Sequence, residues 1–386
     1  MSIYELAILG SVTEDQRDTL VKTLSSMVEE FDLALDDDVR IYGPDTLHDR
    51  NIYAAFSAAY FGGNATDDLD SVRKLVDASL PIIPTIDING DFGTGIPDIL
   101  QSTNGLKLAN DDKEMTELAT AMLECVGLLR RQRRVFVSYR RIESRAAAVQ
   151  LHDVLSGRGF DVFLDTHDIL KGEPFQDALW HRLCDSDVMI MLDTPTYFES
   201  KWTRQEIGRA RAKEIQVLRV IWPDLTPSRM TDLAETIYLE AAELVDADGP
   251  IVDAKMDVIS LAVEWLRSKS IASRYMSITG RLRADIEKIG GTVEGVGAHR
   301  AISIRLPDES KIWAYPVVGV PSAEILNDIA EKSARANYQE TPVLVYDHIG
   351  IRDTWMAHLQ WLDDHIKVVR SIKISEAAWS LAAWEG

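Results

Sequence analysis

Cysteines, long apolar runs and basic residues are all scarce in this sequence. Its 386 residues include two cysteines, which are too few for a disulfide framework or a thiolate metal cage. No run approaches the ~18 uninterrupted apolar residues that a membrane helix needs, and no basic stretch precedes the short apolar segment at the start. We therefore expect a soluble protein of the reducing cytoplasm that does not bind a membrane.

Acidic residues outnumber basic ones, with 62 Asp and Glu against 41 Lys and Arg, for a formal net charge of −21. Residues 1–129 alone hold 24 acidic and 8 basic residues. Proteins that bind nucleic acid carry a basic surface, so we exclude nucleic acid as a partner and interpret the basic run at 130–134 as a linker. The remaining composition, 46% hydrophobic and 27% charged, is that of a globular protein, and the length predicts two or three domains.

Residues 1–129 alternate strand-like and helix-like signals, which predicts an acidic α/β domain with a mostly parallel, doubly wound sheet. The expected strands cover 4–10, 39–43 and 81–86, and the expected helices cover 15–31, 67–79 and 112–129. The glycine-rich run GDFGTG at 90–95 is interpreted as a surface turn rather than a phosphate-binding loop, because Ile96 and Pro97 follow it.

Residues 134–268 repeat this alternation more clearly, and their strands are nearly continuous apolar runs, as expected of strands covered on both faces. The expected strands are 135–139, 160–165, 188–192 and 217–222. The expected helices run from Ser144, as N-cap, to 155, from Pro174 onward, over 203–213 and near 254–268.

Residues 270–386 differ in character and predict a mixed α/β domain, to which we assign a sensor or assembly role. A hairpin is expected from 301–306 and 311–318, followed by helix 322–336, strand 343–347, helix 352–366 and strand 368–374. Residues 58–86 also show a weak internal similarity to residues 195–221, since each segment has a Tyr-Phe loop, a helix and a strand in that order. We treat as a hypothesis that the first domain is a degenerate copy of the second.

Several residues of the second segment could form one cleft, because ligands bind at the carboxyl ends of parallel strands and the loops 139–145, 165–174 and 193–202 gather there. The i, i+4 spacing of Trp202 and Glu206 places the indole beside the carboxylate on one helix face. The expected cleft residues are Tyr139, Arg140, Asp165, Phe175, Trp202 and Glu206. Such a cleft suits a nucleotide whose sugar becomes cationic during reaction.

Each of these residues also has a purely structural interpretation. Glu206 could complement the helix dipole or pair with Arg204 or Arg209, and Trp202 could fill the core. The pair Tyr139 and Arg140 could close a strand beside a surface salt bridge. Asp165 could be a turn residue. No metal is expected, because His152, His167 and His181 lack a tight ligand spacing.

Ordered motifs over residues 134–245 resemble the Toll/interleukin-1 receptor (TIR) domain family. They are VFVSYRR at 135–141, GFDVFLD at 159–165, GEPF at 172–175, CDSDVMIMLDTPTYFESKWTRQE at 184–206 and VLRVIWP at 217–223. The resemblance implies a flavodoxin-like fold for the central domain, and the first domain is then TIR-like as well. Where related loops often carry Ser-Pro after the third strand, this chain has Asp193, Thr194 and Pro195.

For the NAD⁺-cleaving branch of this family, the resemblance implies a catalytic glutamate four residues after a tryptophan, which Glu206 and Trp202 match. It also implies substrate-binding residues, matched here by Tyr139, Arg140, Asp165, Gly172, Phe175 and Trp202. The expected activity is NAD⁺ glycohydrolase, with NAD⁺ as substrate and without cofactor or metal. A homo-oligomer acting as an effector in prokaryotic immune, including antiphage, or stress signalling is expected. The alternative is a non-catalytic scaffold that binds other TIR domains.

Overall fold

The computed structural model describes most of the chain and divides it into two compact units. The described residues are 2–103, 105–109, 112–128, 133–164, 175–229, 234–247, 249–336 and 340–384. The first unit comprises Met1–Leu128, Ala272–His348 and Met356–Gly386, and the second comprises Leu129–Ile271 with Ile349–Trp355. Within the described residues the chain forms three five-stranded sheets, so the expected α/β class with parallel sheets is confirmed. None of the helices in these ranges is both long and apolar enough to span a membrane.

The first sheet is parallel throughout and has the strand order β2-β1-β3-β4-β5. Its strands are β1 (Tyr4–Gly10), β2 (Val39–Tyr42), β3 (Ala55–Phe61), β4 (Ile82–Asp87) and β5 (Leu106–Leu108). Its helices are α1 (Glu14–Glu29), α2 (Leu69–Asp77), the short α3 (Phe92–Gly95) and α4 (Asp112–Cys125). The run GDFGTG therefore contains α3, with Asp91 as its N-cap.

Strand β3 is a part of the first sheet that the sequence pattern did not predict. It pairs with β1 on one side and with β4 on the other, and all seven of its residues are buried. Alanine has a low strand propensity and the run AFSAAYF shows no alternation, which is why the pattern fails. Tyr60 and Phe61 close this strand, whereas Tyr197 and Phe198 form a 3₁₀ turn, η4 (Tyr197–Glu199). The two internally similar segments, 58–86 and 195–221, therefore do not correspond residue by residue.

The second sheet is also parallel, with the order β10-β9-β8-β6-β7. Its strands are β6 (Arg134–Ser138), β7 (Asp161–Leu164), β8 (Val188–Asp193), β9 (Gln216–Ile221) and β10 (Glu235–Tyr238). Numbered within this sheet the order is 2-1-3-4-5, which is the flavodoxin-like order, and the first sheet has the same order.

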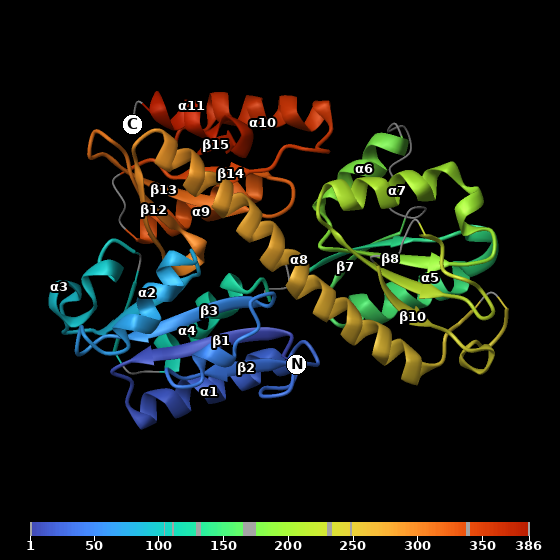
Figure 1. Cartoon of the computed structure of the whole chain (residues 1–386), viewed down its shortest axis with the longest axis horizontal. Helices are drawn as coiled ribbons and strands as arrows, with labels where there is room; N and C mark the ends of the chain where they lie inside the picture. Colours follow the sequence, from blue (N-terminus) through green and yellow to red (C-terminus); the bar gives the residue numbers. More distant parts are fainter. Residues whose placement is uncertain are drawn as a thin grey trace. The chain divides into compact units, whose positions relative to one another are not determined.

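Helices cover both faces of the second sheet (Figure 1). On one face lie α6 (Phe175–Asp185) and α7 (Lys201–Ala212), packed on a core that includes Phe136 and Met191. On the other face lie α5 (Arg141–Gly157) and the first part of α8 (Asp253–Lys288), packed on a core that includes Val135, Val137 and Tyr139. Successive residues of β6 therefore point to opposite faces, as strand geometry requires.

Three helices in this region differ from the expected ones by two or more residues at one end at least. Helix α5 begins at Arg141 and is kinked at Ser144, whose φ of −148° is non-helical, so a short helical turn precedes the expected N-cap. The helix expected near 254–268 continues to Lys288, since buried residues line it throughout and Gly290, with φ +84°, follows its end. Helix α7 begins at Lys201, two residues before the expected start at 203. Strand β10 was not expected, because it is a short edge strand with only partly buried residues.

The third sheet is mixed, with the order β11-β12-β13-β14-β15. Its strands are β11 (Thr292–Val296), β12 (Ile302–Arg305), β13 (Lys311–Val317), β14 (Val343–Tyr346) and β15 (Arg370–Lys373), and its helices are α9 (Ala323–Arg335), α10 (Asp353–His365) and α11 (Ala377–Ala382). The expected hairpin is confirmed as the antiparallel pair β12 and β13. Strand β11 pairs with β12. The sequence pattern did not predict this strand, because it contains a glycine and polar residues.

Candidate active site

The carboxyl edge of the second sheet brings together polar residues from three elements. Strands β6 and β8 are neighbours there, although the helices that follow them cover opposite faces of the sheet. This topological switch point is where open α/β sheets bind ligands. Ser138 ends β6 and Asp193 ends β8, and both side chains are buried.

Glu206 is buried at this edge, with 3% of its surface exposed. The Ser138 hydroxyl donates a hydrogen bond to its Oε2 atom, and the Tyr197 hydroxyl lies 2.6 Å from Ser138 Oγ. Because the serine proton is directed to the carboxylate, the tyrosine hydroxyl is the donor in the second contact. Tyr197, Ser138 and Glu206 thus form a chain of hydrogen bonds that ends on the carboxylate.

The start of α7 determines where Glu206 lies. Ser200 is the N-cap, and its Oγ accepts a hydrogen bond from the Trp202 backbone N–H at 3.2 Å. Since the helix begins at Lys201, Glu206 lies in its second turn, beyond the first turn where the helix dipole acts most strongly. Arg209, one expected alternative partner of Glu206, has its guanidinium 4.1 Å from the centre of the Trp180 ring.

Tyr197 remains a neutral phenol in this environment. Burial, and next the charge of Glu206, raise the pKa of the Tyr197 phenol well above its ordinary value. The phenol therefore stays protonated at neutral pH and keeps its proton for Ser138. A neutral donor chain stabilises a carboxylate without adding a second charge.

Asp193 and Arg219 form a second buried pair at the same edge. Arg219 Nε lies 3.8 Å from Asp193 Oδ2, and Arg219 also donates to the Ser228 carbonyl at 3.2 Å. Burial raises the pKa of Asp193 to about 6, although Arg219 opposes the shift. Arg219, Ser138 and Tyr197 were not among the site residues expected from the sequence. An arginine inside the apolar run VLRVIW is a signal that could have identified it, because a buried charge requires a partner.

Of the expected binding residues, Trp202 is exposed near this edge and Arg140 is partly exposed. Trp202 lies one turn before Glu206 on α7 and is 43% exposed. Arg140 donates to the Thr196 carbonyl and lies 3.3 Å from Glu199 Oε2, on a carboxylate side chain that is 70% exposed. Such an exposed ion pair is worth about 0–1 kcal/mol, so a bound phosphate can replace Glu199 at little cost.

The other expected residues are Tyr139, Phe175, Asp165 and Gly172, and of these only Tyr139 has a described side chain. Tyr139 is buried in the core on the opposite face of the sheet, because it follows Ser138 directly in the alternation. Phe175 begins α6. Asp165 and Gly172 lie outside the described residues.

The expectation that this edge holds no metal stays a prediction. Within the described ranges no group of three or more His, Cys, Asp and Glu side chains is arranged to hold a metal ion. His152 pairs with its neighbour Asp153, and the His181 ring packs on Trp355 with ring centres 4.8 Å apart. His167 lies outside the described residues.

Comparison with known proteins matches part of the chain to one family. The family model described as TIR domain matches residues 135–249. Two solved structures show weak similarity: the C-terminal domain of glucosamine-fructose-6-phosphate aminotransferase from Francisella tularensis, at 8% identity, and tagatose-6-phosphate ketose/aldose isomerase from Escherichia coli, at 12% identity. The match to the aminotransferase domain covers 70% of this chain and 84% of that structure. The match to the isomerase covers 72% of this chain and 82% of that structure. Both have a TM-score of 0.19, which is too low to support any argument. No curated protein matches the chain. The resemblance is thus confirmed by the family match, which shows that residues 135–249 of this chain are a TIR domain.

Proposed function

We propose that the TIR domain cleaves the bond between nicotinamide and ribose in NAD⁺, with Glu206 as the catalytic carboxylate. The observation that carries this proposal is the burial of Glu206 at the carboxyl edge of the sheet, where Ser138 holds it. A carboxylate in a site with little water stabilises a nearby positive charge far more strongly than one in bulk solvent does.

The charge changes of the reaction explain why a carboxylate is required. When the bond breaks, its electron pair goes to the nicotinamide nitrogen, which becomes neutral, and the ribose becomes an oxocarbenium-like cation. Glu206 stabilises this cation more than it stabilises the substrate, which lowers the barrier. Water then adds to the sugar carbon and loses a proton, which gives ADP-ribose and nicotinamide. Hydrogen bonds from Tyr197 through Ser138 keep the carboxylate oriented during this step.

The exposed residues near the edge take binding roles in this proposal. Trp202 provides an aromatic surface for the nicotinamide ring, and Arg140 binds the diphosphate after it leaves Glu199. Asp165, Gly172 and Phe175 are assigned to the substrate by family resemblance. Tyr139 supports the sheet from the opposite face rather than touching the substrate.

Self-association is the second part of the proposal, because TIR sites are commonly completed by a neighbouring subunit. We infer that this chain acts as a homo-oligomeric effector of immune or stress signalling in the cytoplasm, with NAD⁺ loss as its output. Specific activity should therefore rise with protein concentration. A concentration series of at least a hundredfold, with size determined by light scattering, measures both quantities in one experiment.

Incubating the purified chain with NAD⁺ and quantifying nicotinamide by chromatography tests the reaction. Glu206→Gln keeps the size of the side chain and removes its charge, so turnover should fall about 10²- to 10³-fold or more. Glu214→Gln is the matched control, since Glu214 is exposed just beyond the same helix and should leave turnover unchanged. Equal turnover in the wild type and Glu206→Gln would remove Glu206 from its role. Self-association without nicotinamide release at any concentration would favour the non-catalytic scaffold.

A further inference from the structure

A pocket lies at the carboxyl edge of the TIR domain, lined in part by the loop that follows β8. It is an open pocket of about 560 Å³, within the range of small-molecule sites. Its lining residues come from the segments that follow β8, β9 and β10 in the chain and from the first turn of α5. The lining residues used below are Glu143, Pro195, Trp222, Ala241, Leu244 and Asp246.

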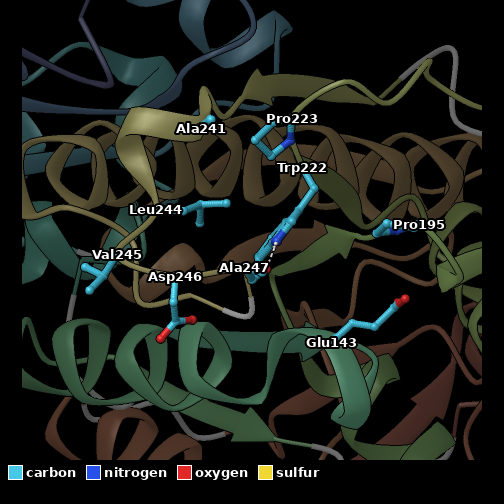
Figure 2. Close-up of a pocket in the computed structure, with 9 residues that line it drawn as sticks. All are labelled: Glu143, Pro195, Trp222, Pro223, Ala241, Leu244, Val245, Asp246 and Ala247. Atoms are coloured by element: carbon cyan, nitrogen blue, oxygen red, sulfur yellow. Dashed lines mark hydrogen bonds between the residues drawn. The ribbon is translucent and has the colours of Figure 1, made fainter.

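The pocket has an apolar wall whose orientation is fixed. Trp222 follows β9 directly, and its indole N–H donates to the Ala247 carbonyl at 3.0 Å. Figure 2 shows the Trp222 side chain between Leu244 on one side and Pro195 with Glu143 on the other. A fixed indole with aliphatic neighbours suits a flat aromatic base.

Glu143 provides the polar side of the pocket. Its Oε2 atom accepts hydrogen bonds from Thr194 Oγ1 at 2.6 Å and from the Thr196 backbone N–H at 3.3 Å. Burial opposes ionisation, but these bonds and the charge of Arg140 outweigh it and lower the pKa of Glu143. The carboxylate is therefore ionised at neutral pH. Within the described part of the chain no hydrogen bond reaches its Oε1 atom, which can accept one from a ligand.

The loop after β8 connects this pocket to the proposed catalytic site. The Thr196 N–H contacts Glu143 on the pocket side, and its carbonyl accepts from Arg140. The next residue, Tyr197, contacts Ser138 beside Glu206. Neighbouring strands are about 4.8 Å apart, so the ends of β8 and β9 lie roughly one and two strand spacings from the end of β6. Trp222 and Leu244 pack with the core on the α5 side of the sheet, whereas Tyr197, beside Glu206, packs with the core on the α7 side. A dinucleotide that occupies both places therefore passes over the carboxyl edge of the sheet at Arg140.

We propose that this pocket binds the adenosine end of NAD⁺, an inference that rests on the proposed function. Its lining residues include two carboxylates, Glu143 and Asp246, and no cation, so the pocket disfavours phosphate. The same carboxylates accept hydrogen bonds from ribose hydroxyls and from the adenine amino group. The diphosphate then lies outside the pocket, at Arg140.

Binding is tested without chemistry by titrating the full chain with ADP-ribose and with adenosine in a calorimeter. Ala241→Trp places a large side chain in the pocket, and Ala242→Trp is the matched control, because Ala242 is exposed next to it but does not line the pocket. We expect Ala241→Trp to weaken ADP-ribose binding at least tenfold and Ala242→Trp to leave it unchanged. Equal affinity in the two variants, or no binding of either probe by the wild type at millimolar concentration, would overturn the inference.

Catalysis gives a second test that separates this inference from the proposed function. Nicotinamide mononucleotide contains the bond that breaks but lacks adenosine. Ala241→Trp should therefore lower kcat/KM for NAD⁺ at least tenfold and leave kcat/KM for nicotinamide mononucleotide within twofold. An equal effect on both substrates, or on neither, would contradict the pocket assignment while leaving the reaction in place. If the wild type cleaves neither substrate, the proposed function fails, and the ADP-ribose titration alone decides the pocket.

Discussion

The Ser138 hydroxyl donates a hydrogen bond to the Glu206 carboxylate, which joins the end of β6 to the second turn of α7. A hydrogen bond to a charged group contributes about 1.5–3 kcal/mol. Ser138→Ala should therefore lower kcat for NAD⁺ about tenfold, less than Glu206→Gln does, and should destabilise the domain by about 1–3 kcal/mol. Steady-state kinetics and urea unfolding measure the two effects.

The matched control for this prediction is Ser260→Ala. Ser260 is also buried in the second unit, but its hydroxyl donates to the Met256 carbonyl of its own helix. It should leave kcat unchanged. Wild-type kcat in Ser138→Ala would show that the serine does not position Glu206.

A buried ion pair attaches the first part of α8 to the second sheet. Arg267 Nε lies 3.0 Å from Asp187 Oδ2, and both side chains are buried. Removing one partner of such a pair leaves an uncompensated charge, so Arg267→Ala should cost about 3–5 kcal/mol in the free energy of unfolding. Arg158→Ala breaks a pair with Asp257, whose side chain is 68% exposed, and should cost no more than about 1 kcal/mol. Urea denaturation followed by circular dichroism compares them, and similar costs would contradict the prediction.

Glu124 should make the first unit sensitive to acid. It accepts hydrogen bonds from His299 Nδ1 at 2.5 Å and from Lys332. Burial raises its pKa, but the hydrogen bond and charge of His299 and those of Lys332 outweigh burial and lower the pKa from 4.5 to about 2. Because the folded value is the lower one, the stabilisation is complete above pH 4.5 and is lost as the pH falls toward 2.

The shift corresponds to about 3 kcal/mol of stability. Glu124→Gln should remove this acid-dependent stabilisation. At pH 5 the variant should therefore have a lower free energy of unfolding than the wild type, and this difference should shrink as the pH falls to 2. Hydrogen exchange of α4 amides at several pH values measures it. Glu117→Gln, at an exposed position of the same helix, is the control. A constant deficit for Glu124→Gln across this range would refute the assignment.

A short segment of the chain after β14 packs on the TIR domain within the second unit. Cys184 Sγ donates to the Gly350 carbonyl at 3.1 Å, and Gly350 has φ +78°. A Cβ atom at position 350 would lie 2.6 Å from that sulfur. Gly350→Ala should therefore displace the segment and increase the reaction rate of the Cys184 thiol with a disulfide reagent at least tenfold. The measurement uses a Cys125→Ala background, which leaves one cysteine in the chain.

Gly290→Ala provides the control for backbone strain. Gly290 has φ +84°, and the nearest atom to its added Cβ would be Pro307 Cγ at 3.6 Å. Both substitutions place alanine in the left-handed region, which costs about 1–2 kcal/mol. Only Gly350→Ala should expose Cys184, and equal thiol rates would show that the segment does not cover it.

The central strands of the TIR domain, β6, β8 and β9, could be predicted because each is covered on both faces. The runs at 135–139, 188–192 and 217–222 are almost wholly apolar, and the structure places them in the middle of the second sheet. Strands β10 and β11 lie at sheet edges, where partial exposure weakens the hydrophobic pattern. Strand β3 is central and buried, but its alanines carry little strand signal.

The sequence by itself determined the proximity of Trp202 and Glu206, because an i, i+4 pair is local to one helix and needs no tertiary contact. It also identified the TIR domain, because several motifs of that family occur in the family's order along the chain. Only the tertiary structure decided that Ser138 rather than Tyr139 reaches Glu206. The reason is that strand alternation places the two neighbours on opposite faces, and which face receives α7 depends on the packing of residues that are 68 positions apart.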